Sequence, residues 1–98
     1  MSGPLRDTND LRRRILFCTV PSWPRCRVME VILTEIARLQ DFELVRMDAS
    51  KAEFSKVFQE LGIKCVPSYV FLDQGKEIYR GEGVTSTFEI KENLKRTK

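Results

Sequence analysis

Histidine is absent from the 98 residues of this chain. Its absence excludes imidazole bases, cysteine–histidine pairs and the usual histidine-containing zinc sites. Long hydrophobic runs are missing as well, since no apolar stretch approaches the roughly 18–20 residues that a membrane-spanning helix needs. We therefore predict a protein without a metal site and without a membrane segment.

Cysteine is scarce. The chain has three, Cys18, Cys26 and Cys65, and its N-terminal residues contain no apolar stretch that resembles a signal peptide. An odd number of cysteines without such a signal favours free thiols in a reducing compartment over a disulfide framework. We therefore expect a cytoplasmic protein.

A large excess of charge of one sign is also missing, because the net charge is only +3. The basic residues cluster near the two ends, at 12–14 and 95–98, and are not interleaved with aromatic residues as nucleic-acid binding would favour. A hydrophobic fraction of 42% with 32% charged residues is typical of one globular domain. We expect a flexible N-terminal tail, residues 1–13, one domain over residues 14–96, monomeric behaviour and no nucleic-acid partner.

Hydrophobic periodicity predicts seven elements in that domain. Apolar runs of strand length cover residues 14–20, 42–47, 68–72 and 76–80, and helical periodicity covers residues 25–40, 51–61 and 86–96. The resulting order is β-α-β-α-β-β-α. Helical crossovers predict parallel strand pairs and the closing hairpin predicts an antiparallel pair. We therefore expect an α/β protein with a mixed sheet of about four strands, helices on both faces, and the first strand in a central position.

The helices carry further local signals. In the first helix the predicted core stripe consists of Val28, Ile32, Ile36 and Leu39, widened by Met29 and Leu33. In the last helix Phe88, Ile90 and Leu94 are the expected apolar contacts. The Ser-x-x-Glu spacing of a capping box recurs at Ser50–Glu53 and at Ser86–Glu89, and predicts the starts of the second and third helices.

Two motifs carry the functional information. Cys26 ends the sequence Trp23-Pro24-Arg25-Cys26, at the junction of the first strand and the first helix. Val66-Pro67 stands directly before the third strand, where a proline is tolerated and can form a cis peptide bond. We predict that this bond is cis and that Pro67 lies against the loop of Cys26.

These motifs, with the turn at residues 73–75 and the glycines Gly81 and Gly83, resemble the thioredoxin superfamily over residues 14–94. The resemblance implies a thioredoxin-like fold in which the first strand of the full fold is reduced or missing. Active members carry Trp-Cys-x-x-Cys. Aligning the second cysteine with Cys26 places Trp23 at the nucleophilic position and Phe17 where those members keep a buried acid. We therefore expect a poor disulfide reductase, with Phe17 buried beneath the loop.

This chain is similar to two branches of the superfamily that lack the first cysteine. The N-terminal domain of multidomain monothiol glutaredoxins of the PICOT type reads Trp-Ala-Pro-x-Cys, which resembles residues 22–26 best. Phosducin-like and related thioredoxin-domain cochaperones come second, through Arg25-Cys26-Arg27. The first resemblance implies a link to redox or iron–sulfur homeostasis.

The thiols leave alternatives open. Cys26 is either a reactive thiol, favoured by Arg25, Arg27 and the helix N-terminus, or a buried remnant that packs as a small hydrophobic residue. Cys65 is either a resolving thiol for Cys26 or an ordinary loop cysteine. Cys18, inside an apolar strand, is expected in the core.

The leading hypothesis is a protein-binding or adaptor module. Trp23 is either an exposed anchor for a partner or folded back over the sheet edge. Pro24 and Arg25 flank it, and Val66-Pro67 resembles the edge on which relatives hold extended peptides or glutathione. The alternative is a monothiol, glutathione-linked oxidoreductase with Cys26 as the working thiol. We expect no cofactor under the first hypothesis and glutathione under the second.

Overall fold

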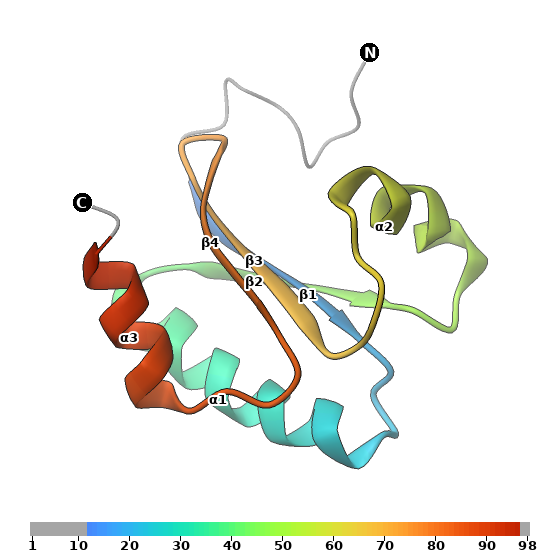
Figure 1. Ribbon diagram of the computed structural model, residues 1–98, viewed down its shortest axis with the longest axis horizontal. Helices are drawn as coiled ribbons and strands as arrows, with labels where there is room; N and C mark the ends of the chain where they lie inside the picture. The colour runs from blue at the N-terminus through green and yellow to red at the C-terminus, as the bar shows by residue number, and fades with distance from the viewer. Residues whose placement is uncertain (1–11, 97–98) are drawn as a thin grey trace.

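The computed structural model describes residues 12–96, and within them four strands form one sheet (Figure 1). The elements are β1 (Arg13–Thr19), α1 (Pro24–Gln40), β2 (Glu43–Asp48), the short 3₁₀ helix η2 (Ala52–Phe54), α2 (Ser55–Leu61), β3 (Ser68–Asp73), β4 (Lys76–Glu82) and α3 (Thr87–Arg96). The strand order is β2-β1-β3-β4, so β1 has the predicted central position. The α/β mixed sheet that the sequence predicted is therefore present.

The direction of β3 corrects one prediction. β1 and β2 are parallel, but β3 pairs antiparallel with β1, so the second crossover does not give a parallel pair. Met47 of β2 and Ser68 of β3 both pair with Cys18 of β1. The connection through α2 thus starts and finishes at the same end of the sheet. β3 therefore runs through the sheet in the direction opposite to β1 and β2.

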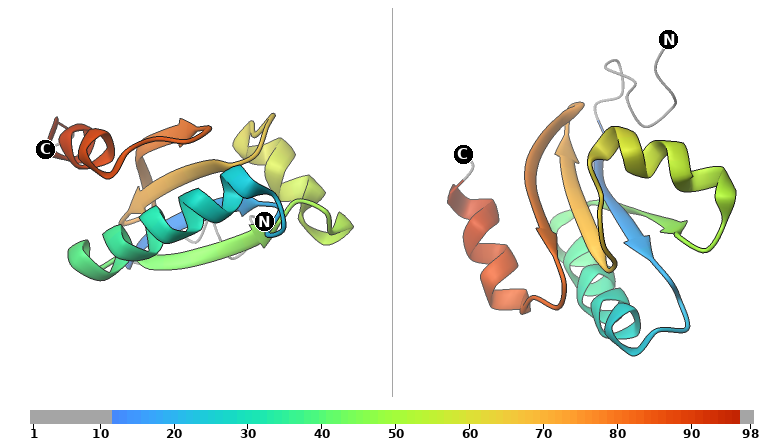
Figure 2. Two further views of the ribbon diagram at one scale, coloured as in Figure 1. Left: turned by 90° about the horizontal axis from the view of Figure 1, so that it is seen from below. Right: turned by 45° about the vertical axis from the view of Figure 1, so that its right-hand side comes forward.

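Helices cover both faces of the sheet, as predicted, and α2 lies across the strands from α1 and α3 (Figures 1 and 2). Alternate residues of β1 supply the two halves of the core. Ile15 and Phe17 pack with buried residues of α1 and α3, whereas Leu16 and Cys18 face the apolar side of η2 and α2. Arg80 of β4 donates from Nη1 to the carbonyl oxygen of Leu61, the last residue of α2, at 2.8 Å.

The core stripe of α1 differs from the prediction. Val28 and Leu39 are 47% and 51% exposed, and the buried residues are Cys26, Met29, Leu33, Ile36 and Ala37. The helix is rotated because β2 is the last strand on its side of the sheet, so the face of α1 that carries Val28 extends beyond the strands. Phe88, the first predicted contact of α3, is 73% exposed, while Ile90 and Leu94 are buried as expected.

Of the two predicted capping boxes, only the serine half of one forms. The backbone N–H of Glu89 donates to Ser86 Oγ at 3.1 Å at the start of α3. Ser50 instead donates both its N–H and its hydroxyl to Asp48 Oδ1, at 2.9 and 2.7 Å, and no side chain caps η2 or α2. The aspartate at the end of β2 competes for the serine by forming a local turn, which shortens the helix that follows.

The predicted N-terminal tail lies almost wholly outside the described residues. β1 begins at Arg13, one residue before the predicted domain start at residue 14. Among the described helices, none is long and apolar enough to cross a membrane.

Candidate functional site

The loop between β1 and α1 is held by its own backbone. The N–H of Trp23 donates to the carbonyl oxygen of Val20 at 2.9 Å, and the N–H of Arg27 donates to the carbonyl oxygen of Trp23 at 3.0 Å. Pro24 occupies the first turn of α1, where its missing N–H costs no helical hydrogen bond. The loop therefore delivers Cys26 into the first turn of the helix in a fixed position.

Cys26 is a free thiol that is only 1% exposed. Its Sγ accepts a hydrogen bond from the backbone N–H of Val20 at 3.3 Å. The residue three positions earlier, where an active dithiol site has its nucleophilic cysteine, is Trp23. This loop therefore carries one shielded sulfur and no second thiol.

Phe17 is fully buried, as predicted. It belongs to the core cluster that contains Met29 of α1 and Tyr69 of β3. Met29 follows Cys26 by about one helical turn, so the cluster that contains Phe17 reaches the start of α1. No carboxylate stands at this position to move a proton to or from the Cys26 thiol.

The Val66–Pro67 peptide bond has the predicted cis geometry. Ser68, which follows it, pairs with Cys18, and Cys26 contacts Val20, so both motifs lie at the same end of β1. Pro67 itself is fully buried and Val66 is partly buried. The ring of Pro67 therefore presents no apolar edge to solvent.

A third segment, after β4, closes the same end of the sheet. The N–H of Gly83 donates to the carbonyl oxygen of Pro67 at 2.8 Å. Thr85 accepts a hydrogen bond from the hydroxyl of Tyr69 and donates its N–H to Met29 Sδ at 3.4 Å. Gly81 leaves room for the Tyr69 ring, since a Cβ at Gly81 would meet that ring at 2.6 Å. These contacts join the proline loop, β3 and α1 into one packed unit.

Cys65 is exposed, and its thiol points to other partners than Cys26. It donates to Glu82 Oε1 at 3.2 Å and lies 3.8 Å from Ser68 Oγ. The hydrogen bond to the Glu82 carboxylate raises the pKa of the Cys65 thiol above its usual value. The three cysteines are free thiols, so a resolving role for Cys65 stays a prediction.

Replacement of Glu82 with glutamine will make Cys65 react faster with iodoacetamide at neutral pH, by about threefold or more. The reason is that the uncharged amide no longer favours the protonated thiol. Site-resolved mass spectrometry of timed alkylation measures the rate. The matched control is Glu92→Gln on α3, which leaves the Cys65 rate unchanged. The rates of wild type and Glu82→Gln will converge at high pH, where the thiol is ionised in both.

The exposed part of the site consists of Trp23, Pro24 and Arg25. Trp23 is 52% exposed, so of the two orientations left open by the sequence it has the outward one. Arg25 and Arg27 are exposed beside it. Among the described residues, no group of three or more cysteine and carboxylate side chains could hold a metal ion.

Sequence reasoning missed the contribution of Glu82, Thr85 and Tyr69. Their partners are 16 or 17 residues away in the chain, on the neighbouring strand or in an adjoining loop, so no local spacing indicates them. Gly81 was a usable signal, because an isolated glycine inside a strand pattern indicates close approach of another group.

Comparison with known proteins identifies the fold. No family model and no curated protein matches the sequence. Among solved structures, thioredoxin O2 from Arabidopsis thaliana superposes with a TM-score of 0.78 at 18% identity, over 94% of this chain and 81% of that one. A mutant thioredoxin from Halobacterium salinarum gives 0.79 at 16% identity, over 99% and 85%. Thioredoxin NaTrxh from Nicotiana alata gives 0.74 at 23% identity, over 93% and 77%. The chain therefore has the predicted thioredoxin-like fold.

Proposed function

We propose that this thioredoxin-like domain is a protein-binding or adaptor module in which the dithiol chemistry of the fold has been lost. The observation that carries the proposal is the difference in solvent exposure between two residues of the loop. Trp23, at the position of a nucleophilic cysteine, is 52% exposed, while Cys26 is 1% exposed. The loop thus presents an aromatic side chain to solvent, while its only thiol is buried.

The chemistry of disulfide exchange supports this proposal. Exchange requires an accessible thiolate for attack and a second thiol to resolve the mixed disulfide. Cys26 is inaccessible, and Cys65, which is accessible, donates its proton towards Glu82 and has a raised pKa. Neither thiol combines exposure with an environment that favours the thiolate.

The exposed loop is suited to binding. The backbone of Trp23 is fixed by hydrogen bonds to Val20 and Arg27, so a partner has to order only its side chain. Tryptophan and arginine are enriched among the residues that dominate binding energy. We infer a partner segment that places an apolar side chain against Trp23 and a carboxylate near Arg25.

The finer assignment follows from the resemblance of residues 22–26 to PICOT-type monothiol glutaredoxins. We propose on this basis a role linked to redox or iron–sulfur homeostasis, in a reducing compartment such as the cytoplasm. A Cys-Gly-Phe-Ser motif elsewhere in the parent reading frame would support the assignment. An unrelated neighbouring domain would favour the cochaperone branch.

One contact favours the second candidate function, a glutathione-linked monothiol oxidoreductase. The N–H of Val20 donates to Cys26 Sγ, and the N-terminus of α1 lies at the same sulfur. Both would stabilise a thiolate if the loop opened. In that reaction the Cys26 thiolate would attack a glutathione mixed disulfide, and release of the substrate thiol would leave glutathione on Cys26 until a second glutathione removed it.

Turnover assays separate the two functions. We expect no reduction of insulin and no turnover of a glutathione mixed disulfide above the uncatalysed rate, and no change on Cys26→Ser. Robust turnover that disappears in Cys26→Ser would reverse this conclusion.

A binding experiment tests the adaptor function directly. Peptides selected from a random library on the wild-type chain should lose at least about tenfold in affinity on Trp23→Ala. Since Trp23 is the only tryptophan, its fluorescence reports binding directly.

A further inference from the structure

A second surface lies at the outer edge of the sheet, next to the loop that carries Trp23. β2 is an edge strand, and among residues 12–96 its only strand neighbour is β1. The N–H of Ala49 donates to the carbonyl oxygen of Thr19, which fixes the direction of the backbone groups along β2. Because these groups alternate, the N–H and C=O groups of Leu44 and Arg46 and the N–H of Asp48 point away from β1. The carbonyl oxygen of Asp48 is already used, since it accepts from the N–H of Lys51 at 3.0 Å. This edge therefore offers hydrogen-bonding positions for one more strand.

An open groove of about 950 Å³ lies at the carboxyl end of this edge. α1 contributes Val28 and Val31 to its wall, and η2 contributes Phe54. Val31 is 70% exposed, although it stands in the middle of a helix that packs on the sheet. The apolar wall therefore faces the space that a strand added to β2 would border.

The side-chain directions of an added strand fit this groove. Arg46, whose backbone groups point outward, has its side chain on the α1 side of the sheet, where it meets Glu30. Residues of a neighbouring strand that stand opposite one another point to the same face. Alternate side chains of a strand paired with β2 would thus enter the groove beside Val28 and Val31.

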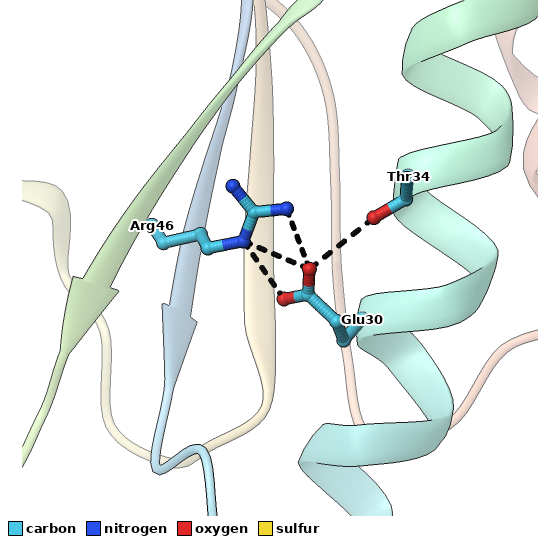
Figure 3. A network of polar contacts seen from close by, with 3 residues as sticks. All are labelled: Glu30, Thr34 and Arg46. Atoms are coloured by element: carbon cyan, nitrogen blue, oxygen red, sulfur yellow. Dashed lines mark hydrogen bonds and ion pairs between the residues drawn. The ribbon is translucent and has the colours of Figure 1, made fainter.

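The Glu30–Arg46 ion pair fixes the width of the groove (Figure 3). Arg46 donates from Nε and Nη2 to Glu30 Oε2 at 2.8 and 2.6 Å, and Thr34 donates to the same oxygen at 3.3 Å. These hydrogen bonds join α1 to the edge strand and neutralise both charges. The Glu30–Arg46 pair therefore positions α1 relative to β2. The other charged side chains of the groove remain available to bind an occupant.

Those remaining charges are separated along the groove. Asp48 is engaged by Ser50 and by the charge of Lys51. Arg27, at the α1 end, and Glu53, in η2, have no ion-pair partner among the described residues. A complementary occupant therefore carries a carboxylate at one end and a cation at the other, with apolar side chains between them.

We propose that the edge of β2 and this groove bind an extended segment of a partner protein by adding it to the sheet as a fifth strand. Backbone hydrogen bonds to Leu44, Arg46 and the N–H of Asp48 supply affinity, as in other cases of strand addition. Apolar side chains against Val28 and Val31, an acid against Arg27 and a base against Glu53 supply specificity. Pro21 and Cys26 of the neighbouring loop also line the groove, but Trp23 does not.

The test uses the full chain and an acetylated, amidated peptide in which threonine alternates with glutamate, two valines and lysine. Its groove-facing positions reproduce the proposed chemistry. We expect saturable binding by fluorescence anisotropy and slower hydrogen exchange, read by NMR, at the amides of Leu44, Arg46 and Asp48. N-methylation of one alternate set of peptide amides should abolish binding, whereas methylation of the other set should not. An unchanged exchange rate at these three amides under saturating peptide would overturn the proposal.

Matched variants locate the surface. Val31→Lys should weaken binding by about tenfold or more, while Leu39→Lys, at another exposed position on the same helix but outside the groove, should not. Arg27→Glu should weaken binding of the glutamate peptide, and the peptide with lysine in its place should recover the loss. Equal effects of Val31→Lys and Leu39→Lys would contradict the proposal.

Other occupants give different results, and each would replace the proposal. If the molecular mass of the chain alone rises with its concentration, and this self-association is lost in Val31→Lys, the edge binds a second copy of the chain. Binding only of a peptide with the sequence of residues 1–11 would assign it to this chain. Loss of peptide binding in Trp23→Ala, with Val31→Lys unaffected, would place the peptide at the loop and leave the edge without a ligand.

Discussion

Replacement of Phe17 with aspartate will leave a large fraction of the chain unfolded at neutral pH. Phe17 is fully buried, so the change removes an aromatic ring from the core and places a carboxylate there. Loss of a buried ring alone costs about 3–5 kcal/mol. Desolvation of an unpaired carboxylate adds to this, and the total is comparable to the whole stability of a small domain, about 5–15 kcal/mol. Chemical denaturation followed by circular dichroism measures the loss.

The pH dependence identifies the cause. Burial raises the pKa of an aspartate above its value of about 3.9 in the unfolded chain. The loss of stability in the variant should therefore be smallest below about pH 4 and should grow as the pH rises, because the fold favours the protonated acid. The matched control is Phe88→Asp, at a residue that is 73% exposed, where the change should stay within about 0.5 kcal/mol. Equal stabilities of the two variants would show that Phe17 does not lie in the core.

The second large effect concerns the core stripe of α1, in which Leu33 is both predicted and observed whereas Leu39 is predicted but exposed. Leu33 is fully buried in the cluster between the sheet, α1 and α3, so Leu33→Ala should cost about 2–5 kcal/mol. Leu39, which the periodicity placed in the stripe, is 51% exposed, and Leu39→Ala should cost less than about 1 kcal/mol. Urea denaturation of both variants gives the comparison. A larger loss for Leu39 would support the orientation that the sequence predicted.

Most of the fold could be predicted because its signals are local. The apolar run of β1, the change to helical periodicity after Pro24 and the glycine that ends α2 at Gly62 each depend on neighbouring residues. The rotation of α1 could not be predicted in this way. It depends on which strand lies at the edge of the sheet, and the residues around Val28 do not indicate that this strand is β2. The direction of β3 was missed for the same reason, since it is set by the register of Met47 and Ser68 on either side of β1.

The candidate site shows the same division. The cis bond before Pro67 and the burial of Phe17 followed from the motifs and the resemblance. The burial of Pro67 did not, because it depends on the segment from Gly81 to Thr85, which packs over the same end of the sheet. The partner of Cys65 was also out of reach, since Glu82 meets it only after β3 and β4 pair.

The sparse attachment of α2 has a consequence for the motions of the chain. No residue of α2 is fully buried, and the helix relies on partly buried side chains and on the hydrogen bond from Arg80. A segment with so few buried contacts opens at a lower free energy than the rest of the domain. Cys18, whose pKa burial raises to about 12, lies under this segment. Its sulfur is therefore covered by a helix that has no buried residue of its own, and local unfolding of α2 would expose it to oxidants.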